Sequence, residues 1–171
     1  MKFNWLRFDD MKASTAISLL TLRNRVFGEA GLYQAQEVDD IDKYCDHLCV
    51  SNHLNQVVGC LRIYQLKHSV DINAFQIGRL CVDEYYRNQK IAKKMLGMAI
   101  VRGMGQGLEA TFETYSPVYL SEFYKSLGFD VRGDPYTEDD IPLIRMKLSQ
   151  PSILEIQQEP TEVHKRKVRV S

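Results

Sequence analysis

The chain has 171 residues, of which 44% are hydrophobic and 26% are charged, and its 22 basic and 22 acidic side chains give a formal net charge of zero. This length suits one globular domain that buries roughly two thirds of the surface of its unfolded chain, and the composition excludes a disordered protein. A neutral chain has no overall field that recruits nucleic acid, so nucleic acid is not expected as a partner. No run approaches the ~18 apolar residues of a membrane span, and the first residues lack the apolar core of an export signal. We therefore expect a cytoplasmic protein without a membrane partner.

Hydrophobic patterns in the first part of the chain predict a strand, a helix and a hairpin. Asp10 or Ser14 can cap the helix. In order, the predicted elements are a strand at residues 3–8, a helix reaching about Phe27, an acidic loop or short helix at 37–46, and antiparallel strands at 48–51 and 57–64. This order predicts a mixed architecture.

The second part of the chain continues this mixture. Ser116 is a good N-cap, Pro117 suits the first position of a helix, and Gly128 suits the left-handed residue that ends one. Around this helix the patterns predict a strand at 76–82, a helix at 88–103, a strand at 108–114, and last strands at 129–131 and 143–148. We therefore predict one domain at residues 1–148 and a polar and basic extension at 149–171, which is expected to be solvated or to pair with a sheet edge rather than to bind nucleic acid.

The four cysteines lie in or beside apolar segments of a chain without an export signal, which predicts buried, reduced thiols. Cys45, His47, Cys49 and His53 fall within nine residues, but their spacing lacks the paired arrangement of a structural zinc site. No metal is expected, and the alternation predicts that His47 and Cys49 share one face of a strand.

The most informative segment is residues 86–92, because it joins an apolar strand to an amphipathic helix. Ile91, Met95 and Ala99 recur at helical spacing, while Lys93 and Lys94 lie off that stripe. The start of a helix offers unpaired backbone N–H groups and a partial positive charge, which together favour an anionic ligand. The segment therefore predicts a phosphate-binding loop.

This segment resembles motif A of the GNAT N-acetyltransferase superfamily, whose loop holds the pyrophosphate of acetyl-CoA. Arg87 and Ala92 match the first and last positions of that motif, and Lys90 stands where it has glycine. The resemblance also implies that the strand ending near Val82 exposes its backbone to the pantetheine arm. The residues implied to contact acetyl-CoA are Leu80, Cys81, Val82, Arg87, Asn88, Gln89, Lys90, Ile91, Ala92, Lys93, Tyr119 and Phe123.

A second segment resembles motif B of the same superfamily, a helix that carries Phe-Tyr, three further residues and Gly-Phe. Phe123 and Tyr124 match the first pair, and Gly128 and Phe129 match the second. The resemblance implies that Tyr124 is the general acid that protonates the departing thiolate of coenzyme A. The alternative is that Tyr124 only packs its helix against the sheet.

The likeness extends over most of residues 3–148 and is similar to the ElaA-like branch of GNAT proteins. The segments that carry it further are residues 22–27, 37–42, 46–48, 58–62, 77–79 and 136–142. It implies an α/β (α+β) fold with a mixed, mostly antiparallel sheet of six to seven strands, flanked by helices and splayed between strands 4 and 5.

The implied reaction moves an acetyl group from acetyl-CoA to a primary amine by direct attack. Such attack requires a neutral amine, so a base or a water chain ending on a carboxylate must remove a proton. The candidates are Glu37, Asp39, Asp42 and Glu113. Alternatively, Asp39 and Asp42 pair with Arg23, Arg62 or Arg79 and have a structural role.

Two other functions stay open at this point. The arginine and aspartate set also resembles acyl-homoserine lactone synthases, which share the fold, and the departure at Lys90 leaves room for an acyl-CoA-binding module without catalysis. Peptide N-termini, lysines, amino sugars and polyamines all remain open as small-molecule or peptide acceptors. The oligomeric state is not readable from the sequence, so a homodimer also remains open.

Overall fold

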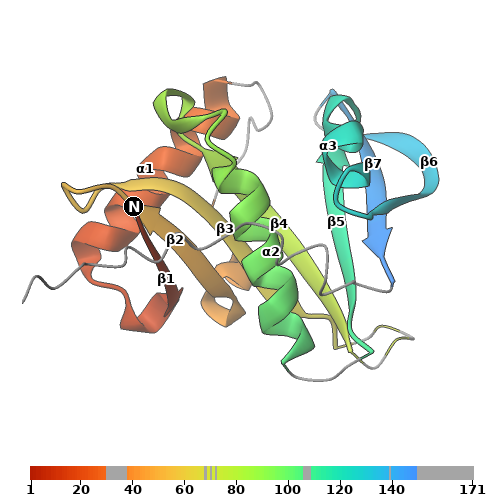
Figure 1. The fold of residues 1–171 in the computed structure, drawn as a ribbon, viewed down its shortest axis with the longest axis horizontal. Helices are drawn as coiled ribbons and strands as arrows, with labels where there is room; N and C mark the ends of the chain where they lie inside the picture. Colours follow the sequence, from red (N-terminus) through yellow and green to blue (C-terminus); the bar gives the residue numbers. More distant parts are fainter. Residues whose placement is uncertain are drawn as a thin grey trace, which may run out of the picture.

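The computed structural model describes residues 1–29, 38–67, 69, 71, 73–105, 109–138 and 140–149. Its centre is a seven-stranded sheet in the order β1-β2-β3-β4-β5-β7-β6, in which every neighbouring pair is antiparallel except β4 and β5 (Figure 1). The strands are β1 (Lys2–Arg7), β2 (Asp46–Ser51), β3 (Val57–Gln65), β4 (Ala74–Val82), β5 (Thr111–Pro117), β6 (Asp130–Glu138) and β7 (Ile141–Leu148). The predicted mixed and mostly antiparallel sheet is confirmed.

Helices cover both faces of the sheet. Helix α1 (Ala13–Glu29) packs over β3 and β4 on one face, and α2 (Ile91–Met104) packs over the same strands on the other (Figure 1). The short helix α3 (Ser121–Lys125) packs against β6 and β7 and joins the core on the α2 side. The described 3-10 turns are η1 (Phe8–Asp10), η2 (Asp40–Tyr44), η3 (Glu84–Tyr86) and η4 (Val118–Leu120).

The two faces of the sheet have separate cores because side chains alternate along each strand. On β2, Leu48 and Val50 belong to the core under α2, whereas Cys49 belongs to the smaller core under α1. Helix α2 contributes Met95 and Ala99 to the larger core, and both are fully buried. The helical stripe predicted for this segment is therefore the face that holds α2 on the sheet.

The sheet opens between β4 and β5. These strands are paired only at residues 74–76 of β4 and 111–113 of β5. Farther along, β5 stays beside β7 up to Pro117, and β4 stays beside β3 up to Val82, so the two strands diverge (Figure 1). The predicted splay is thereby confirmed, and the backbone of β4 beyond Gln76 has no strand on its β5 side.

The start of the motif B helix differs from the prediction. Ser116 and Pro117 remain in β5, where they pair with Ile144 and Leu143 of β7. A proline is tolerated at the end of a strand, where its missing N–H costs little. Turn η4 follows, and α3 begins only at Ser121. The predicted capping roles of Ser116 and Pro117 are therefore wrong.

Other helix ends also depart in part from the sequence-based expectation. Helix α1 begins at Ala13, and the carbonyl of Lys12 accepts hydrogen bonds from the N–H groups of Thr15 and Ala16. The N-cap position therefore falls at Lys12, and not at Asp10 or Ser14 as predicted. Gly128 is left-handed, with φ of 86°, as its position after the motif B helix predicted.

The four cysteines are reduced and buried, as predicted. Cys45, Cys49, Cys60 and Cys81 are free thiols, and all four are buried. Across the part of the chain that the structure describes, no three His, Cys, Asp or Glu side chains come together in a way that could hold a metal ion. His47 is instead buried, with its Nε2 atom 2.9 Å from the carbonyl oxygen of Asp42.

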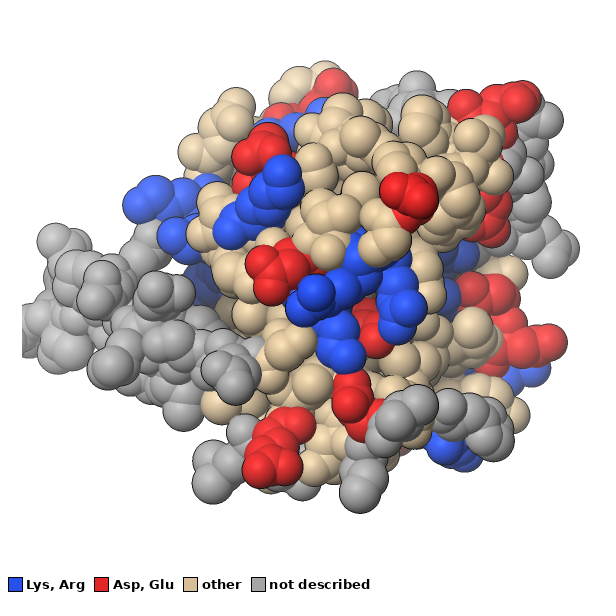
Figure 2. Space-filling model, turned by 90° about the vertical axis from the view of Figure 1, so that its right-hand side faces the viewer, with Lys and Arg blue, Asp and Glu red and all other residues tan. Residues whose placement is uncertain are grey.

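The surface along the β7 and β6 side of the sheet carries several ion pairs. Figure 2 shows basic side chains near the centre of this face with acidic ones beside them. Lys147 of β7 pairs with Asp71 at 2.6 Å, and Arg145 of β7 pairs with Glu113 at 2.7 Å.

In the described ranges, no helix combines the length and the apolar character needed to cross a membrane. The predicted extension, apart from Ser149, lies outside the described residues.

Candidate active site

A small pocket of about 80 Å³ lies where β4 and β5 separate. Its walls come from β4, from the end of β5, from the η4 and α3 segment, from the β6–β7 hairpin and from the end of α1. The lining residues are Phe27, Gly78, Arg79, Leu80, Thr114, Tyr115, Pro117, Leu120, Tyr124, Glu138, Ile141 and Leu143.

The pocket reaches through the sheet. Thr114 and Tyr115 are consecutive residues of β5, so their side chains point to opposite faces, yet both line the pocket. Tyr124 belongs to the core on the α2 side, whereas Phe27 belongs to the core on the α1 side. A group held on one face of the sheet can therefore meet a group that arrives from the other face.

Tyr124 lies on the α2 side of this pocket and is buried. Burial raises the pKa of Tyr124 to about 12, and a hydrogen bond with the Thr114 side chain opposes that rise. The ring packs edge-on against Phe123 and Phe129, which fix its orientation. Tyr124 is therefore a protonated phenol at neutral pH and a fixed hydrogen-bond donor at the pocket wall.

The predicted phosphate loop forms the turn between β4 and α2. Asn88 and Lys90 both adopt left-handed conformations, with φ of 61° and 57°. Lys90 is the N-cap of α2, and its carbonyl accepts a hydrogen bond of 3.0 Å from the N–H of Lys94. Glycine adopts this conformation without strain, which explains why motif A has glycine at this position. Lys90 keeps the backbone course of glycine at a cost of about 1–2 kcal/mol.

Side chains on both sides hold this loop in place. The Nε atom of Arg87 donates a 3.2 Å hydrogen bond to the carbonyl of Val82, and Asp83 forms an ion pair with Arg25 of α1. Helix α2 begins at Ile91, three residues later than predicted, because left-handed residues precede it. The amide N–H groups of its first turn have no acceptor within the helix and are oriented for an anion.

The other residues predicted to contact acetyl-CoA are divided among the pocket, the two cores and the surface. Leu80 lines the pocket, Val82 belongs to the core under α2, and Cys81 points into the core under α1. Phe123 is half-buried beside Tyr124, and Tyr119 is exposed on η4. Their contact with a cosubstrate stays a prediction.

Glu113, one of the predicted bases, is not on the wall of the Tyr124 pocket. Its buried carboxylate binds Arg145 through Nη2 at 2.7 Å and Nε at 3.1 Å. Both residues line a second, larger cleft of about 810 Å³. Glu113 and Arg145 lie two residues from the pocket residues Tyr115 and Leu143 on the same strands, and the cleft extends as far as Arg102 and Gly103 of α2. Glu37, the other predicted base, lies outside the described residues.

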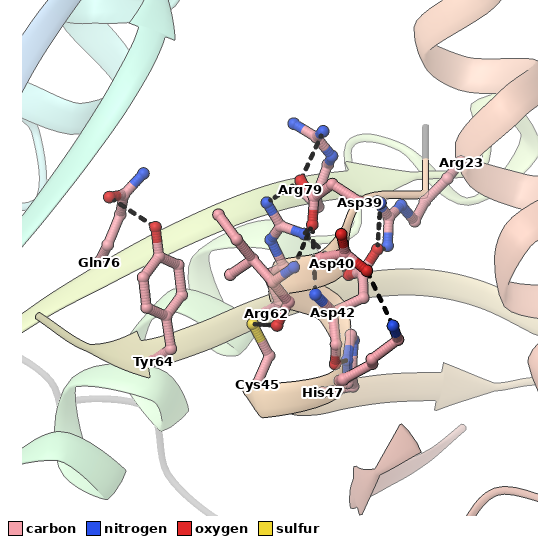
Figure 3. A network of polar contacts seen from close by, with 12 residues as sticks. Arg23, Asp39, Asp40, Asp42, Cys45, His47, Arg62, Tyr64, Gln76 and Arg79 are labelled. Carbon is pink, nitrogen blue, oxygen red and sulfur yellow. Dashed lines mark hydrogen bonds and ion pairs between the residues drawn. The ribbon is translucent and has the colours of Figure 1, made fainter. Parts of the chain in front are cut away.

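Asp39 and Asp42 form a buried ion network with three arginines (Figure 3). The Nη1 atom of Arg62 lies 2.6 Å from Asp39 and 2.8 Å from Asp42, and Arg23 binds Asp42 at 2.9 Å. Arg79, which lines the pocket, reaches Asp39 at 3.4 Å. Asp39 also caps η2 by accepting from two backbone N–H groups. The structural alternative for these two aspartates is thus borne out by their contacts.

The network keeps both carboxylates ionised. Burial works to raise the pKa of Asp42, but the hydrogen bonds and charges of Arg23 and Arg62 lower it further than burial raises it. The pKa of Asp39 is lowered in the same way against burial, by Arg62 first and then by Arg79. Carboxylates that are held in their charged form by arginines are poor proton acceptors, so neither is suited to act as the base.

Most of the residues that line the pocket were not predicted from the sequence, and Glu138 and Phe27 are two of them. Glu138 ends β6 and pairs with Ile141 at the start of β7, and both line the pocket. Phe27 reaches the pocket from the end of α1. Their neighbours in the sequence carry no signal of this role, because only the splay of the sheet brings the β6–β7 hairpin and α1 to the same place.

Comparisons with known proteins agree with this geometry. The family model of the GNAT acetyltransferase domain matches residues 20–150. A UPF0039 protein of Schizosaccharomyces pombe is 28% identical over 149 residues, which are 86% of this chain and 97% of the relative. Protein ElaA of Escherichia coli is 28% identical over 142 residues, 82% of this chain and 92% of ElaA. Among solved structures, an acyl-CoA N-acyltransferase from Pseudomonas aeruginosa matches with a TM-score of 0.76 and 25% identity, over 86% of this chain and 99% of that one.

The matched region contains the splayed strands, the loop before α2 and Tyr124, and it includes every residue that lines the pocket. Both the fold and the family model therefore assign this chain to one group of enzymes: it belongs to the GNAT acetyltransferase family.

Proposed function

We propose that the protein transfers an acetyl group from acetyl-CoA to a primary amine, with Tyr124 as the general acid. The observation that carries the proposal is the pocket at the β4–β5 split. It holds a buried, protonated phenol beside the open backbone edge of β4, and that strand leads to the helix start at Ile91. This arrangement fits a thioester whose pantetheine arm runs along β4 and whose pyrophosphate meets the first turn of α2.

In the proposed reaction the acetyl-CoA thioester lies against Tyr124, and the amine enters from the α1 face. The ammonium loses one proton to solvent at the pocket mouth. The neutral nitrogen then attacks the carbonyl carbon, so that a C–N bond forms and the C–S bond breaks. The thiolate takes the proton of Tyr124, and the second proton of the nitrogen leaves through solvent, which reprotonates Tyr124. One proton is released per turnover.

Placing both reactants in a confined pocket supplies much of the acceleration. Two reactants held in the right geometry gain the equivalent of a very high effective concentration. The wide cleft beside the pocket, lined by Glu113 and Arg145, leaves room for the body of the acceptor.

The experiment that tests the proposal is a panel of primary amines with acetyl-CoA, in which release of free thiol is followed against time. Peptides with a free N-terminus, lysine derivatives, amino sugars and polyamines are included. Isothermal titration with CoA is run beside it. Amine-dependent release of thiol supports the proposal, whereas a protein that neither binds CoA nor releases thiol overturns it.

The same experiment separates the two other functions. An acyl-CoA-binding module without catalysis binds CoA and releases no thiol with any amine. An enzyme similar to acyl-homoserine lactone synthases is identified when the acetyl-CoA donor gives no turnover and an acylated carrier protein or a longer acyl-CoA does. The arginine and aspartate set that pointed to those synthases is bound internally here, through Arg23, Asp42 and Arg62. This internal pairing leaves acetyl transfer as the preferred function.

A further inference from the structure

We propose that Glu138 binds the ammonium group of the acceptor, and that the acceptor is a primary amine with an apolar body next to its nitrogen. This inference rests on the proposed acetyl transfer and adds to it the recognition of the second substrate. Glu138 is the last residue of β6, and its side chain lines the pocket that contains Tyr124. Among the described residues that line this pocket, it is the sole carboxylate.

The register of the strands places Glu138 on the face from which the acceptor enters. Glu138 pairs with Ile141, and Tyr136, two residues earlier, pairs with Leu143. The ring of Tyr136 meets that of Tyr115 edge-on, with centroids 6.2 Å apart. Paired residues and residues two apart point to the same face of a sheet. Glu138 therefore projects on the α1 side, opposite the face on which Tyr124 lies.

Other acidic groups near this face are already occupied. Glu113 is bound by two nitrogens of Arg145, and Asp39 is bound by Arg62. Glu138 forms no ion pair with any residue in the described parts of the chain, and it is exposed at the pocket mouth. An incoming ammonium can pair with Glu138 without breaking an existing pair, which is not true of Glu113 or Asp39.

The surroundings of Glu138 define the chemistry of its ligand. Phe27, Ile141 and Leu143 provide apolar walls around the carboxylate. An amine with a hydrocarbon portion gains from contact with these walls, whereas a densely hydroxylated or polycationic body does not. These groups favour a monoamine such as an alkylamine or an aralkylamine over an amino sugar or a polyamine.

The test compares steady-state kinetics of the wild-type chain and of Glu138→Gln, with 2-phenylethylamine and butylamine as probes and acetyl-CoA as donor. The substitution keeps the shape of the side chain and removes its charge. We expect the KM for each probe amine to rise about tenfold or more, and the KM for acetyl-CoA to stay within about twofold. Glu138→Asp, which keeps the charge, is expected to restore most of the affinity for the amine.

Glu122→Gln is the matched control, because Glu122 is exposed on α3, pairs with Lys125 and does not line the pocket. It should leave both KM values unchanged. An unchanged KM for the amine in Glu138→Gln overturns the inference, as does an equal rise of both KM values. A wild-type chain that acetylates only glucosamine or spermidine overturns the assigned acceptor class. All three results leave the proposed acetyl transfer intact, whereas a chain that transfers to no amine at all overturns both.

Discussion

Tyr124 of α3 is hydrogen-bonded to Thr114 of β5 at the point where β5 turns away from β4. Thr114 is buried and lines the same pocket. Since β5 is held by β7 on its other side, this hydrogen bond ties the phenol to a strand that cannot follow β4. The orientation of the proposed acid thus depends on the strand that turns away from β4.

Replacing Tyr124 with phenylalanine should slow turnover far more than it weakens binding of the donor. The phenol is proposed to act on the leaving thiolate, and general acid catalysis contributes on the order of 10²–10⁴-fold. We expect kcat to fall about 100-fold in Tyr124→Phe, with little change in the affinity for acetyl-CoA measured by calorimetry. Tyr85→Phe, at an exposed position on η3 outside the pocket, is the control. Unchanged kcat in Tyr124→Phe would assign Tyr124 to packing alone.

The pH dependence of turnover offers a separate check on Tyr124. Its pKa is raised to about 12, so the phenol is protonated at every lower pH, and only a rise through that value removes the proton. We therefore expect no loss of kcat between about pH 8 and 10 that traces to Tyr124, although an ordinary tyrosine titrates near 10. The measurement is kcat against pH with saturating substrates. A fall centred near pH 10 that is absent from Tyr124→Phe would contradict this expectation.

Lys90 allows a test of how the loop binds phosphate. Its backbone is left-handed, so Lys90→Gly removes strain while it also removes the ammonium. We expect the free energy of unfolding to change by less than about 1 kcal/mol, because relief of strain offsets the larger entropy of the unfolded chain. If the side chain contacts phosphate, the Kd for CoA rises several-fold and becomes less dependent on salt. Lys93→Ala is the control. Lys93 lies three residues later, in the first turn of α2, so this variant removes a nearby charge without changing the strained residue.

The sequence predicted most strands and helices, because packing on a sheet requires hydrophobic residues at regular spacing along each element. It could not tell a strand end from a helix start at Ser116 and Pro117, since both residues also suit a helix N-terminus and only pairing with β7 decides the outcome. The left-handed conformation of Lys90 was not predicted either, because a lysine side chain does not indicate a positive φ angle.

The candidate site was predictable only where a motif carries it. Tyr124 and the loop before α2 have recognisable neighbours in the sequence, and the structure places them at the two ends of the split in the sheet. Glu138 and Phe27 belong to segments far apart in the chain. Both lie in segments that carry the family likeness, 22–27 and 136–142, but nothing in either segment shows that they meet, which depends on the opening of the sheet. Glu113 had the right chemistry for a base, but its pairing with Arg145 is a contact between strands that the sequence does not reveal.

Asp42 should make folding sensitive to acid. Its pKa lies below the ordinary value, so the carboxylate stabilises the fold above a pH of about 4, and this stabilisation is lost as the pH falls through the lowered pKa. Asp42→Asn removes the buried carboxylate that pairs with both Arg23 and Arg62, and breaking a buried pair costs about 3–5 kcal/mol. Urea unfolding between pH 2 and 7 should show a shallower dependence in the variant than in the wild type. Asp40→Asn, at an exposed neighbouring position, should change nothing, and an equal loss in both variants would contradict the assigned role of the network.

Gly103 should be the position in α2 least able to accept a side chain. A Cβ atom built there would lie 2.5 Å from Cε1 of Phe112 and 2.8 Å from its Cζ, far inside the contact distance of two carbons. Phe112 is fully buried and stacks on Phe75, so its ring has no space into which to retreat. Gly103→Ala is expected to destabilise the fold by about 1–3 kcal/mol, even though alanine is the better helix former. Gly28→Ala in α1 is the matched control, because nothing lies within 4 Å of its Cβ position, and it should stabilise the fold by up to about 1 kcal/mol. Thermal unfolding of both variants therefore gives shifts of opposite sign, and a rise in Tm for Gly103→Ala would show that the core between α2 and β5 is not tightly packed.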